Sequence, residues 1–421
     1  MARQEKFLEE VKSYIRSKEA KRFVTRELEA HLKQSKSDFI KNGYGEEEAE
    51  KQAVANMGSP MILGQKLNQL HRPKIDWSLI TLFISVIAIG ILPFFVLMTE
   101  ETHLSLFQKL ASVVIGIGIV VITLLFDYTK WKKYGWLFFG LGCAVILYAQ
   151  WSGVLVNGRT YLHIPGIIAS DMMITLPLFL LGWAGLLANK KINIYYVSIL
   201  YIVSLGLFLN TASFVISVIY SVMVWGMVWN SHLERKKVAL ASAAYMVGVI
   251  GVMVTAIFSM KEYQLARLKG FLHPEQYSLS EGYYYVLAKG VRENAGWFGT
   301  SEPPGLAEPF SDFVFLALTY RLGWLFGLFL IVILLLLLAR MIIVLTKVKD
   351  SFGRLLVTGS VGAFLIQIVL NIGMSFGVVP AVSVALPFVS YGTAYMIVNS
   401  FMMGVVLSVY RKKDLILLAE R

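Results

Sequence analysis

Long apolar runs recur ten times along this sequence. A helix needs about 20 residues of low polarity to cross a bilayer, and most of these runs reach or approach that length. The sequence therefore predicts an all-α, polytopic membrane protein with about ten transmembrane helices. The runs cover residues 78–98, 106–127, 134–150, 166–188, 194–209, 212–229, 238–259, 313–338, 355–379 and 384–409.

Composition favours a membrane protein over a soluble one. Hydrophobic residues make up 57% of the chain and charged residues 16%, whereas soluble domains are about half apolar and about a quarter charged. The formal net charge of +12 could indicate a nucleic-acid-binding protein. We exclude nucleic acid as a partner because the Lys and Arg residues lie in short loops between apolar runs, as the membrane-orientation rule predicts.

The same charges predict which loops face the cytoplasm. Basic residues follow every even-numbered run, whereas the acidic stretch Thr99-Glu-Glu101 follows the first run. Cytoplasmic loops carry the excess of Lys and Arg, so both termini are predicted to be cytoplasmic. The basic residues after the even-numbered runs are Lys130, Lys132, Lys133, Lys190, Lys191, Arg235, Lys236, Lys237, Arg340, Lys347, Lys349, Arg354, Arg411, Lys412 and Lys413.

Residues 1–75 are predicted to form a small cytoplasmic helical domain, and residues 76–421 a transmembrane domain. Apolar residues recur at helical spacing in three stretches, and Gly58 before Ser59-Pro60 indicates a helix stop and restart. A charged tail without fixed structure is the alternative, but the persistent periodicity favours a bundle. The periodic residues are Phe7, Val11, Tyr14, Ile15, Phe23, Val24, Leu28, Leu32, Ala49, Ala53 and Met57.

The loop at about 259–312, between the seventh and eighth runs, differs from the other loops. It is long and mixes charged residues with Tyr, Trp, Gly and Pro. Loops of this length are uncommon and are usually functional or disordered, and the aromatic content argues against disorder. We predict a large, partly helical extracytoplasmic loop on the outer membrane surface, and we expect the chemistry to lie there.

Three charged residues near the eighth run are candidates for function. Glu308 and Asp312 stand four residues apart, before or within the first turn of the expected helix. The helix dipole favours acidic groups there, so a helix-start carboxylate without a catalytic role explains Asp312 at least as well. Arg321 lies inside the run, where a charge is costly in hydrocarbon. It either faces a cavity and binds phosphate or extends toward the outer surface.

Spaced motifs give a more specific indication. Asn371-Ile-Gly-Met374 is followed by Gly377-Val-Val-Pro380 and then by Leu386-Pro-Phe-Val-Ser-Tyr-Gly392. Their order and spacing resemble the SEDS family of membrane glycosyltransferases, the group of RodA, FtsW and SpoVE. The resemblance is strong over about residues 260–410 and weaker, but collinear, from 78 to 259.

The long loop is similar to that of the SEDS family as well. The matching stretches are Glu262-Tyr-Gln-Leu-Ala-Arg267, His273-Pro-Glu275, Gly282-Tyr283 through Lys289, and Glu308-Pro-Phe-Ser-Asp-Phe313. By motif position, Asp312 corresponds to the loop aspartate that the family is held to need for activity. Several motifs in one order are far more specific than any single one.

The resemblance implies a peptidoglycan glycosyltransferase that polymerises lipid II outside the cytoplasmic membrane, with a class B penicillin-binding protein as partner. Asp312 would act as the general base that takes the proton of the acceptor hydroxyl. Arg267 and Lys289 would stabilise the charge on the leaving lipid pyrophosphate. Anchoring to anionic headgroups explains these two cations about as well.

Further residues have roles that stay open. Glu308 could orient the acceptor, tune Asp312 or join it in binding a divalent cation, Mg²⁺ or Mn²⁺, and no other cofactor is indicated. Ser390 and Tyr391 are candidate substrate contacts, although packing of the Pro-Gly turn explains them equally well.

Three stretches depart from the SEDS pattern. Leu207-Phe-Leu209 stands where members usually carry glutamine-proline-aspartate. Ile168-Ala-Ser-Asp171, with Ile174 after it, stands where they carry glutamine-proline-serine-glutamate and a lysine. Tyr320-Arg321 replaces a pair of glutamates. The polar interior is therefore largely changed, while the loop aspartate remains.

The region 1–75 is similar to the helical prefix domain that is fused to permeases in Gram-positive bacteria. This predicts a Gram-positive source and a cytoplasmic regulator that docks on the bundle.

Three functions stay in competition: a glycosyltransferase serving cell shape, division or sporulation, a flippase for lipid-linked precursors, and a non-catalytic scaffold. The scarcity of polar groups at the membrane midplane counts against the flippase, whereas Glu308 and Asp312 count against the scaffold.

Overall fold

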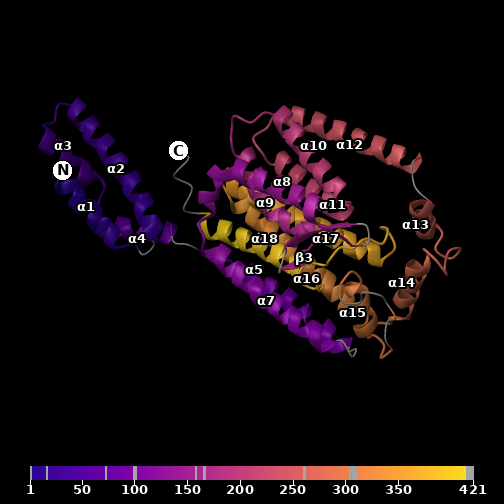
Figure 1. Cartoon of the computed structure of the whole chain (residues 1–421). Coiled ribbons are helices and arrows are strands. Elements are labelled where there is room, and N and C mark those ends of the chain that lie inside the picture. Colours follow the sequence, from indigo (N-terminus) through magenta and orange to yellow (C-terminus); the bar gives the residue numbers. More distant parts are fainter. Residues whose placement is uncertain are drawn as a thin grey trace. The chain divides into compact units, whose positions relative to one another are not determined.

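The computed structural model describes residues 2–15, 18–71, 74–97, 102–156, 159–164, 167–258, 262–302, 305 and 311–413. The chain divides into two compact units (Figure 1). One contains Met1–Asp76, Lys347–Asp350 and Val409–Arg421, and the other contains Trp77–Thr346 and Ser351–Ser408. Most described residues are helical, as the sequence predicts.

Four helices form the N-terminal bundle. They are α1 (Ala2–Ser13), α2 (Lys18–Lys41), α3 (Glu46–Asn56) and α4 (Pro60–His71). Apolar residues repeat every three to four positions, so they share one face of each helix. These faces meet in a core that contains seven of the periodic residues, and an eighth, Ala49, is also buried. The buried residues are Phe7, Leu8, Val11, Ile15, Val24, Leu28, Leu32 and Ala53.

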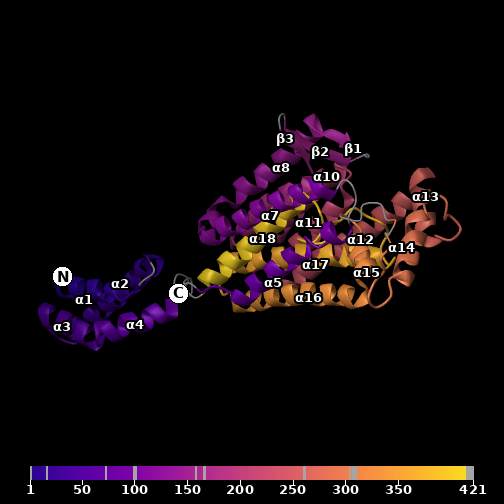
Figure 2. The ribbon, with the colours of Figure 1, turned by 90° about the horizontal axis from the view of Figure 1, so that it is seen from below.

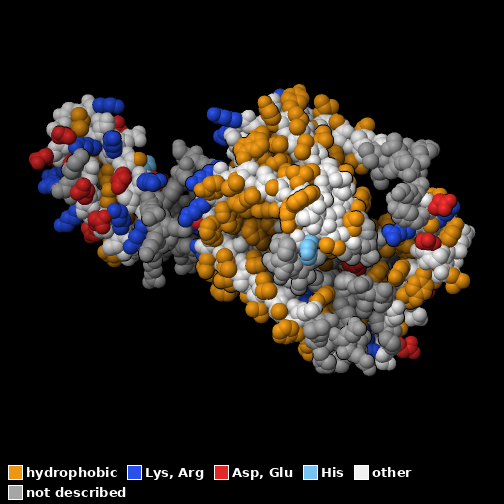
Figure 3. Space-filling view, in the orientation of Figure 1, with side chains coloured by type: hydrophobic (Ala, Val, Ile, Leu, Met, Phe, Trp, Pro, Cys, Tyr) orange, Lys and Arg blue, Asp and Glu red, His pale blue; other side chains and the backbone are white. Residues whose placement is uncertain are grey.

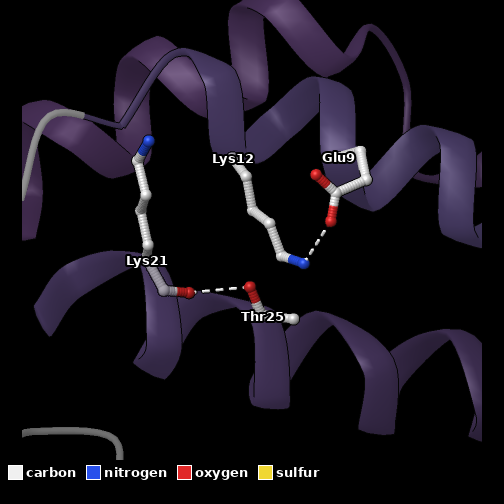
Figure 4. A network of polar contacts seen from close by, with 4 residues as sticks. All are labelled: Glu9, Lys12, Lys21 and Thr25. Atoms are coloured by element: carbon white, nitrogen blue, oxygen red, sulfur yellow. Dashed lines mark hydrogen bonds and ion pairs between the residues drawn. The ribbon is translucent and has the colours of Figure 1, made fainter. Parts of the chain in front are cut away.

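Several polar contacts in the bundle are local. Lys12 Nζ donates to Glu9 Oε1 over 2.6 Å, one turn away on α1, and Thr25 Oγ1 donates to the Lys21 carbonyl over 2.7 Å on α2 (Figure 4). The Glu9 side chain is 71% exposed, and exposed pairs of this kind add little to stability. The apolar core therefore supplies most of the stability of the bundle.

The larger unit consists mainly of apolar helices. Hydrophobic side chains cover much of its visible face, whereas charged side chains dominate the surface of α1–α4 (Figure 3). Large exposed apolar residues such as Phe107, Val114 and Leu240 are expected on surfaces that face lipid. The helices up to the long loop are α5 (Trp77–Ile89), α6 (Pro93–Val96), α7 (Thr102–Leu125), η1 (Tyr128–Tyr134), α8 (Gly135–Ser152), η2 (Met172–Thr175), α9 (Leu176–Leu187), α10 (Ile194–Asn210), α11 (Phe214–Trp229) and α12 (Arg235–Phe258).

Among the described residues, six helical segments are long and apolar enough to cross a membrane. Three shorter apolar helices of 10–17 residues accompany them. Together they support a multi-pass membrane protein, while the count of ten transmembrane helices stays a prediction. The six segments are Trp77–Val96, Leu106–Leu125, Tyr128–Ser152, Trp324–Lys347, Ser351–Ser375 and Thr393–Lys412.

A small antiparallel sheet corrects the all-α prediction. Strands β1 (Val154–Val156), β2 (Arg159–Ile164) and β3 (Ile167–Ser170) pair in the order β1-β2-β3, close to α8 (Figure 2). The run at 166–188 was therefore predicted wrongly as one helix, because its first residues form β3. A short apolar run reads equally well as a strand or a helix, and pairing with β2 decides between them.

The run at 313–338 was also predicted wrongly as one helix. Helix α15 (Val314–Leu322) ends at Gly323, and α16 (Trp324–Lys347) then continues far past residue 338. Gly323 has a φ of +89°, and an added Cβ would collide with the carbonyl of Trp297. Only glycine adopts this conformation readily, so the backbone breaks here.

Two helices, α13 (Glu262–Leu272) and α14 (Tyr283–Asn294), bear out the prediction of a partly helical loop. Helix α14 packs against α15 and the end of α17 (Ser351–Ser375) through Ala288, Val291, Leu316 and Met374. Both ribbon views place α13 and α14 at the end of the unit where α15 begins (Figures 1 and 2).

Residues 376–392, called the 376–392 segment below, form no helix and join α17 to α18 (Thr393–Lys412). The run at 384–409 was thus predicted too long at its start. Pro387 lacks a donor and Phe388 has a φ of +64°, so a continuous helix cannot form here.

Candidate active site

Asp312 lies two residues before α15, and its side chain is half-buried. The main chain at this point is fixed by Asn371, a fully buried residue of α17. Asn371 Nδ2 donates to the carbonyl oxygen of Asp312 over 2.9 Å and to that of Val384 over 2.7 Å. One amide group therefore joins the start of α15 to the 376–392 segment.

The carboxylate of Asp312 meets the same segment. Ser383 Oγ donates to Asp312 Oδ1 over 3.3 Å, so a hydroxyl orients one carboxylate oxygen. The sequence interpretation quoted Asn371 only as part of a motif and assigned no role to Ser383. No local signal marks Ser383, because its partner is 71 residues away in the chain.

Ser390 is buried and serves the backbone. Its Oγ donates to the carbonyl of Ser311 over 2.6 Å and accepts from the Leu386 amide over 2.8 Å. Both contacts are within the protein, and they close the turn that carries Pro387. The structure thus places Ser390 beside Asp312 as a support for the main chain, in line with the packing alternative.

Lys109 of α7 also contacts this turn. The residue is 1% exposed, and its Nζ lies 2.9, 3.2 and 2.8 Å from the carbonyl oxygens of Phe388, Val389 and Ser390. The sequence interpretation missed Lys109, although a cation inside an apolar run is the kind of signal that marks a functional residue.

Tyr391 points toward α7 as well. Its hydroxyl donates to Gln108 Oε1, and its ring packs against Phe94 of α6 with ring centroids 6.2 Å apart. The tyrosine is partly exposed. It therefore remains available to a ligand at one edge, unlike Ser390.

Arg267 and Lys289 occupy different environments. Arg267 is exposed on α13, and no salt bridge joins it to another residue in the described part of the chain. Lys289 of α14 is also exposed, but its Nζ lies 2.7 Å from Glu275 Oε1. This hydrogen bond with Glu275 raises the pKa of Lys289, so the lysine is a cation at neutral pH with its charge already compensated.

Helix α14 contacts the last residue of α17 and the 376–392 segment through two other side chains. Arg292 Nη1 donates to the carbonyl of Ser375 over 2.7 Å, and the Ala381 amide donates to Tyr285 Oη over 3.0 Å. Partial burial lowers the pKa of Arg292 from its ordinary value, and the guanidinium stays charged at neutral pH. These contacts brace the site from the side of the long loop.

Arg321 serves the backbone rather than an open cavity. Its Nε donates to the Val96 carbonyl over 3.0 Å, and its Nη1 donates to the carbonyls of Thr300 and Ser301. The guanidinium thus ties α6 to the loop before α15. Phosphate binding by Arg321 remains a prediction.

Glu308 lies outside the described residues. Within the described part of the chain, no group of three or more His, Cys, Asp or Glu side chains is arranged to hold a metal ion. The Asp312 carboxylate and the Ser383 hydroxyl offer oxygen atoms, and oxygen is the ligand that Mg²⁺ prefers. The pair alone does not complete a site, so the divalent cation stays a prediction.

Comparison with known proteins decides the family. The model of the FtsW/RodA/SpoVE family, described as cell cycle protein, matches residues 74–415. The chain belongs to this family. The resemblance to the SEDS family is therefore confirmed, while the similarity of residues 1–75 to a prefix domain stays a prediction.

Curated members of the FtsW/RodA/SpoVE family share modest identity with the chain. Peptidoglycan glycosyltransferase MrdB of Escherichia coli (strain K12) is 32% identical over 184 residues, which cover 41% of this chain and 50% of MrdB. The chain thus matches only about half the length of this relative. A probable peptidoglycan glycosyltransferase FtsW of Trichlorobacter lovleyi is 24% identical over 72% of this chain and 82% of its own.

Solved structures support the same fold. A chain from a peptidoglycan synthase complex that coordinates polymerization and crosslinking has a TM-score of 0.68 and 20% identity, over 80% of this chain and 98% of that chain. The rod shape determining protein RodA of Thermus thermophilus has a TM-score of 0.61 and 19% identity, over 80% and 97% of the two chains. At these identities the likeness shows the fold alone.

Proposed function

We propose that this chain is a peptidoglycan glycosyltransferase that polymerises lipid II into glycan strands at the outer face of the cytoplasmic membrane, for cell shape, division or sporulation. The observation that carries the proposal is the setting of Asp312. Its main chain is fixed by the buried Asn371, while its side chain is only half-buried and stays within reach of a substrate. Membership of the FtsW/RodA/SpoVE family supports the same activity.

Asp312 acts as the general base in this proposal. The acceptor hydroxyl transfers its proton to the carboxylate while its oxygen forms a bond to the anomeric carbon of the donor. The bond from that carbon to the pyrophosphate oxygen breaks at the same time, and lipid pyrophosphate leaves. Ser383 donates to one oxygen of this carboxylate and so orients the base toward the acceptor.

Arg267 and Lys289 stabilise the leaving pyrophosphate, as cations do where negative charge develops. Arg267 contributes more to this stabilisation than Lys289, because Lys289 is paired with Glu275. Glu308, Tyr391 and Arg321 are proposed to contact substrate around these groups. Mg²⁺ or Mn²⁺ at Asp312 and Glu308 would supply further positive charge, and no step here depends on it.

A class B penicillin-binding protein is the proposed partner, since the similar chain from a synthase complex belongs to an assembly that couples polymerization with crosslinking. The proposal includes about ten transmembrane helices, an outer loop at about 259–312 and cytoplasmic termini. It also includes a separate domain at residues 1–75 and a Gram-positive source. The basic loops after even-numbered runs support the orientation.

The test is polymerisation of purified lipid II by the full chain, with and without a candidate class B penicillin-binding protein. We expect glycan strands from the unaltered protein and none from Asp312→Ala. Removing a general base costs about 10²- to 10⁴-fold in rate. Absence of product under conditions that activate a partnered RodA-type enzyme would contradict the proposal.

A non-catalytic scaffold is the second candidate, because Arg321 stands where the family usually carries an acidic residue and donates to backbone carbonyls. A scaffold would support growth without its carboxylate. Growth of cells that carry only Asp312→Asn therefore separates the two candidates.

A further inference from the structure

Lys109 is a buried cation that the proposed chemistry does not use. It lies on α7, is 1% exposed, and belongs to a segment apolar enough to span a membrane. A lone ammonium group in such surroundings is costly. It persists only where polar groups replace its water shell, and three main-chain carbonyls do so here.

The geometry of Lys109 matches a charged ammonium group. An ammonium group has three N–H donors and no acceptor, and Nζ lies 2.9, 3.2 and 2.8 Å from the carbonyls of Phe388, Val389 and Ser390. Each donor thus has one acceptor on three consecutive residues. Such convergence requires the chain to bend around Nζ, so the turn and the cation depend on each other.

The turn is strained at its centre. Phe388 has a φ of +64°, a conformation that costs a bulky residue of order 1 kcal/mol or more and persists only when its surroundings hold it. Its ring packs against Phe83 and Phe364, with centroids 4.9 and 5.6 Å apart. Gly90, the residue after α5, allows the Phe388 carbonyl to approach closely, since an added Cβ would collide with it.

The same turn supports Asp312. Ser390, whose carbonyl accepts from Lys109, donates through Oγ to the carbonyl of Ser311, the residue before Asp312. Ser390 therefore connects Lys109 Nζ directly to the main chain beside Asp312. A turn that relaxes at Phe388 shifts Ser390, and with it the start of α15.

We propose that Lys109 is a positioning residue for the candidate active site: its ammonium group holds the strained turn at Phe388–Ser390, which in turn sets the position of Asp312. This inference rests on the proposed glycosyltransferase function for its effect on rate. Its structural part, the clamp on the turn, stands independently of that function.

Three variants of the full chain test the proposal. Lys109→Met keeps the length and apolar stem of the side chain but removes the charge, whereas Lys109→Arg keeps the charge and donors in another geometry. Lys190→Met, on an exposed lysine, removes one charge elsewhere and is the matched control. Each protein is assayed for lipid II polymerisation, and amide hydrogen exchange is followed in peptides that cover residues 386–390 and, for reference, 399–409.

We expect Lys109→Met to lower kcat about 10- to 100-fold, as small misplacements near reacting groups do, with KM much less affected. Exchange should accelerate at the amides of Leu386, Val389 and Ser390, which are hydrogen-bonded in the turn, and stay unchanged at 399–409. Lys109→Arg should recover a measurable part of kcat and of the protection. Lys190→Met should match the unaltered protein in both.

Wild-type kcat in Lys109→Met would overturn the proposal, and so would lost activity with unchanged exchange at 386–390. Equal losses of rate and protection in the Met and Arg variants would show that packing, not charge, is what the site needs, and would overturn it too. If the unaltered protein makes no glycan, the proposed function fails. Hydrogen exchange at residues 386–390 in Lys109→Met then tests only whether Lys109 holds the turn. Faster exchange supports that part of the proposal, and unchanged exchange contradicts it.

Discussion

The N-terminal bundle and the 376–392 segment are stabilised by different kinds of interaction. In the bundle, apolar side chains from neighbouring helices form the core. Exposed polar contacts add to it, within one helix as between Glu9 and Lys12 (Figure 4) or between two helices as between Lys36 and Glu46. In the 376–392 segment, buried polar side chains from distant helices donate to main-chain carbonyls. Lys109 reaches it from 279 to 281 positions away, and Asn371 from the preceding helix.

This difference separates stability from position. An apolar contact is non-directional and tolerates small shifts, so the bundle core holds its helices without fixing any one atom. Hydrogen bonds to carbonyls have strict geometry, so the 376–392 segment holds Asp312 at a defined place. Substitutions in the bundle core should therefore change stability alone. Substitutions that remove hydrogen bonds to the 376–392 segment should change activity as well.

The largest effect is expected from Asn371→Leu. The carbonyls of Asp312 and Val384 lose their donor, and each unsatisfied buried group costs about 1–3 kcal/mol. The free energy of unfolding should fall by about 2–6 kcal/mol, and polymerisation by about 100-fold because Asp312 is displaced. Thermal unfolding and the lipid II assay measure the two effects.

The matched control lies one turn away on the same helix. Gln367 and Asn399 exchange reciprocal side-chain bonds of 3.1 Å and are fully buried. Replacing both by Leu removes donor and acceptor together, which is nearly neutral. If the control loses as much activity as Asn371→Leu, the loss follows from removing any buried amide on this helix. Asn371 would then have no specific role in positioning Asp312.

The second effect is expected in the bundle. Leu32 is 1% exposed, and Leu32→Ala should destabilise the bundle by about 2–5 kcal/mol. Polymerisation by the full chain should not change, because no residue of the candidate site lies in α1–α4. Hydrogen exchange in α1 and α2 measures this loss of stability. The control is Ile40→Ala, at a residue that is 43% exposed, and it should leave the exchange rates unchanged. A clear fall in activity with Leu32→Ala would break the separation between stability and position.

The smallest effect distinguishes two exposed cations of the long loop. Arg267→Ala should lower the polymerisation rate several-fold, and Lys289→Ala less, because Glu275 already compensates the charge of Lys289. The pKa of Lys289 is raised by that hydrogen bond. Its pairing is therefore complete at neutral pH and is lost only as the pH rises through values above the ordinary lysine pKa of about 10.4. Polymerisation rates between about pH 6 and pH 9 should show no titration of Lys289. A larger loss of rate in Lys289→Ala than in Arg267→Ala would mean that Lys289, not Arg267, is the more important cation.

The sequence predicted what depends on periodicity. Helical spacing identified Phe7, Val11 and Ile15 as core residues of the bundle, and all three are buried. Apolar length placed most of the apolar helices within a few residues. Motif order identified the family and drew attention to the start of α15, where Asp312 lies.

The sequence could not predict what depends on long-range contacts. Strand β3 was read as helix because only its pairing with β2 distinguishes it. The break at Gly323 depends on the Trp297 carbonyl, which no local pattern shows. Ser390 and Arg321 were candidate substrate contacts, with packing and an outward position as their alternatives. Their described contacts are to the backbone, and substrate binding by either residue stays a prediction. Ser383 was missed because its partner is 71 positions away in the chain. Lys109 was missed although a cation inside an apolar run is a local signal.

The most direct measurement of the central claim is lipid II polymerisation by Asp312→Asn beside the unaltered protein, each with the same penicillin-binding partner. Asparagine keeps the size of the side chain and leaves the main-chain bond from Asn371 in place, but it cannot accept the proton. We predict that the folded variant forms no detectable glycan. Polymerisation by Asp312→Asn at the unaltered rate would contradict the role of Asp312 as the catalytic base.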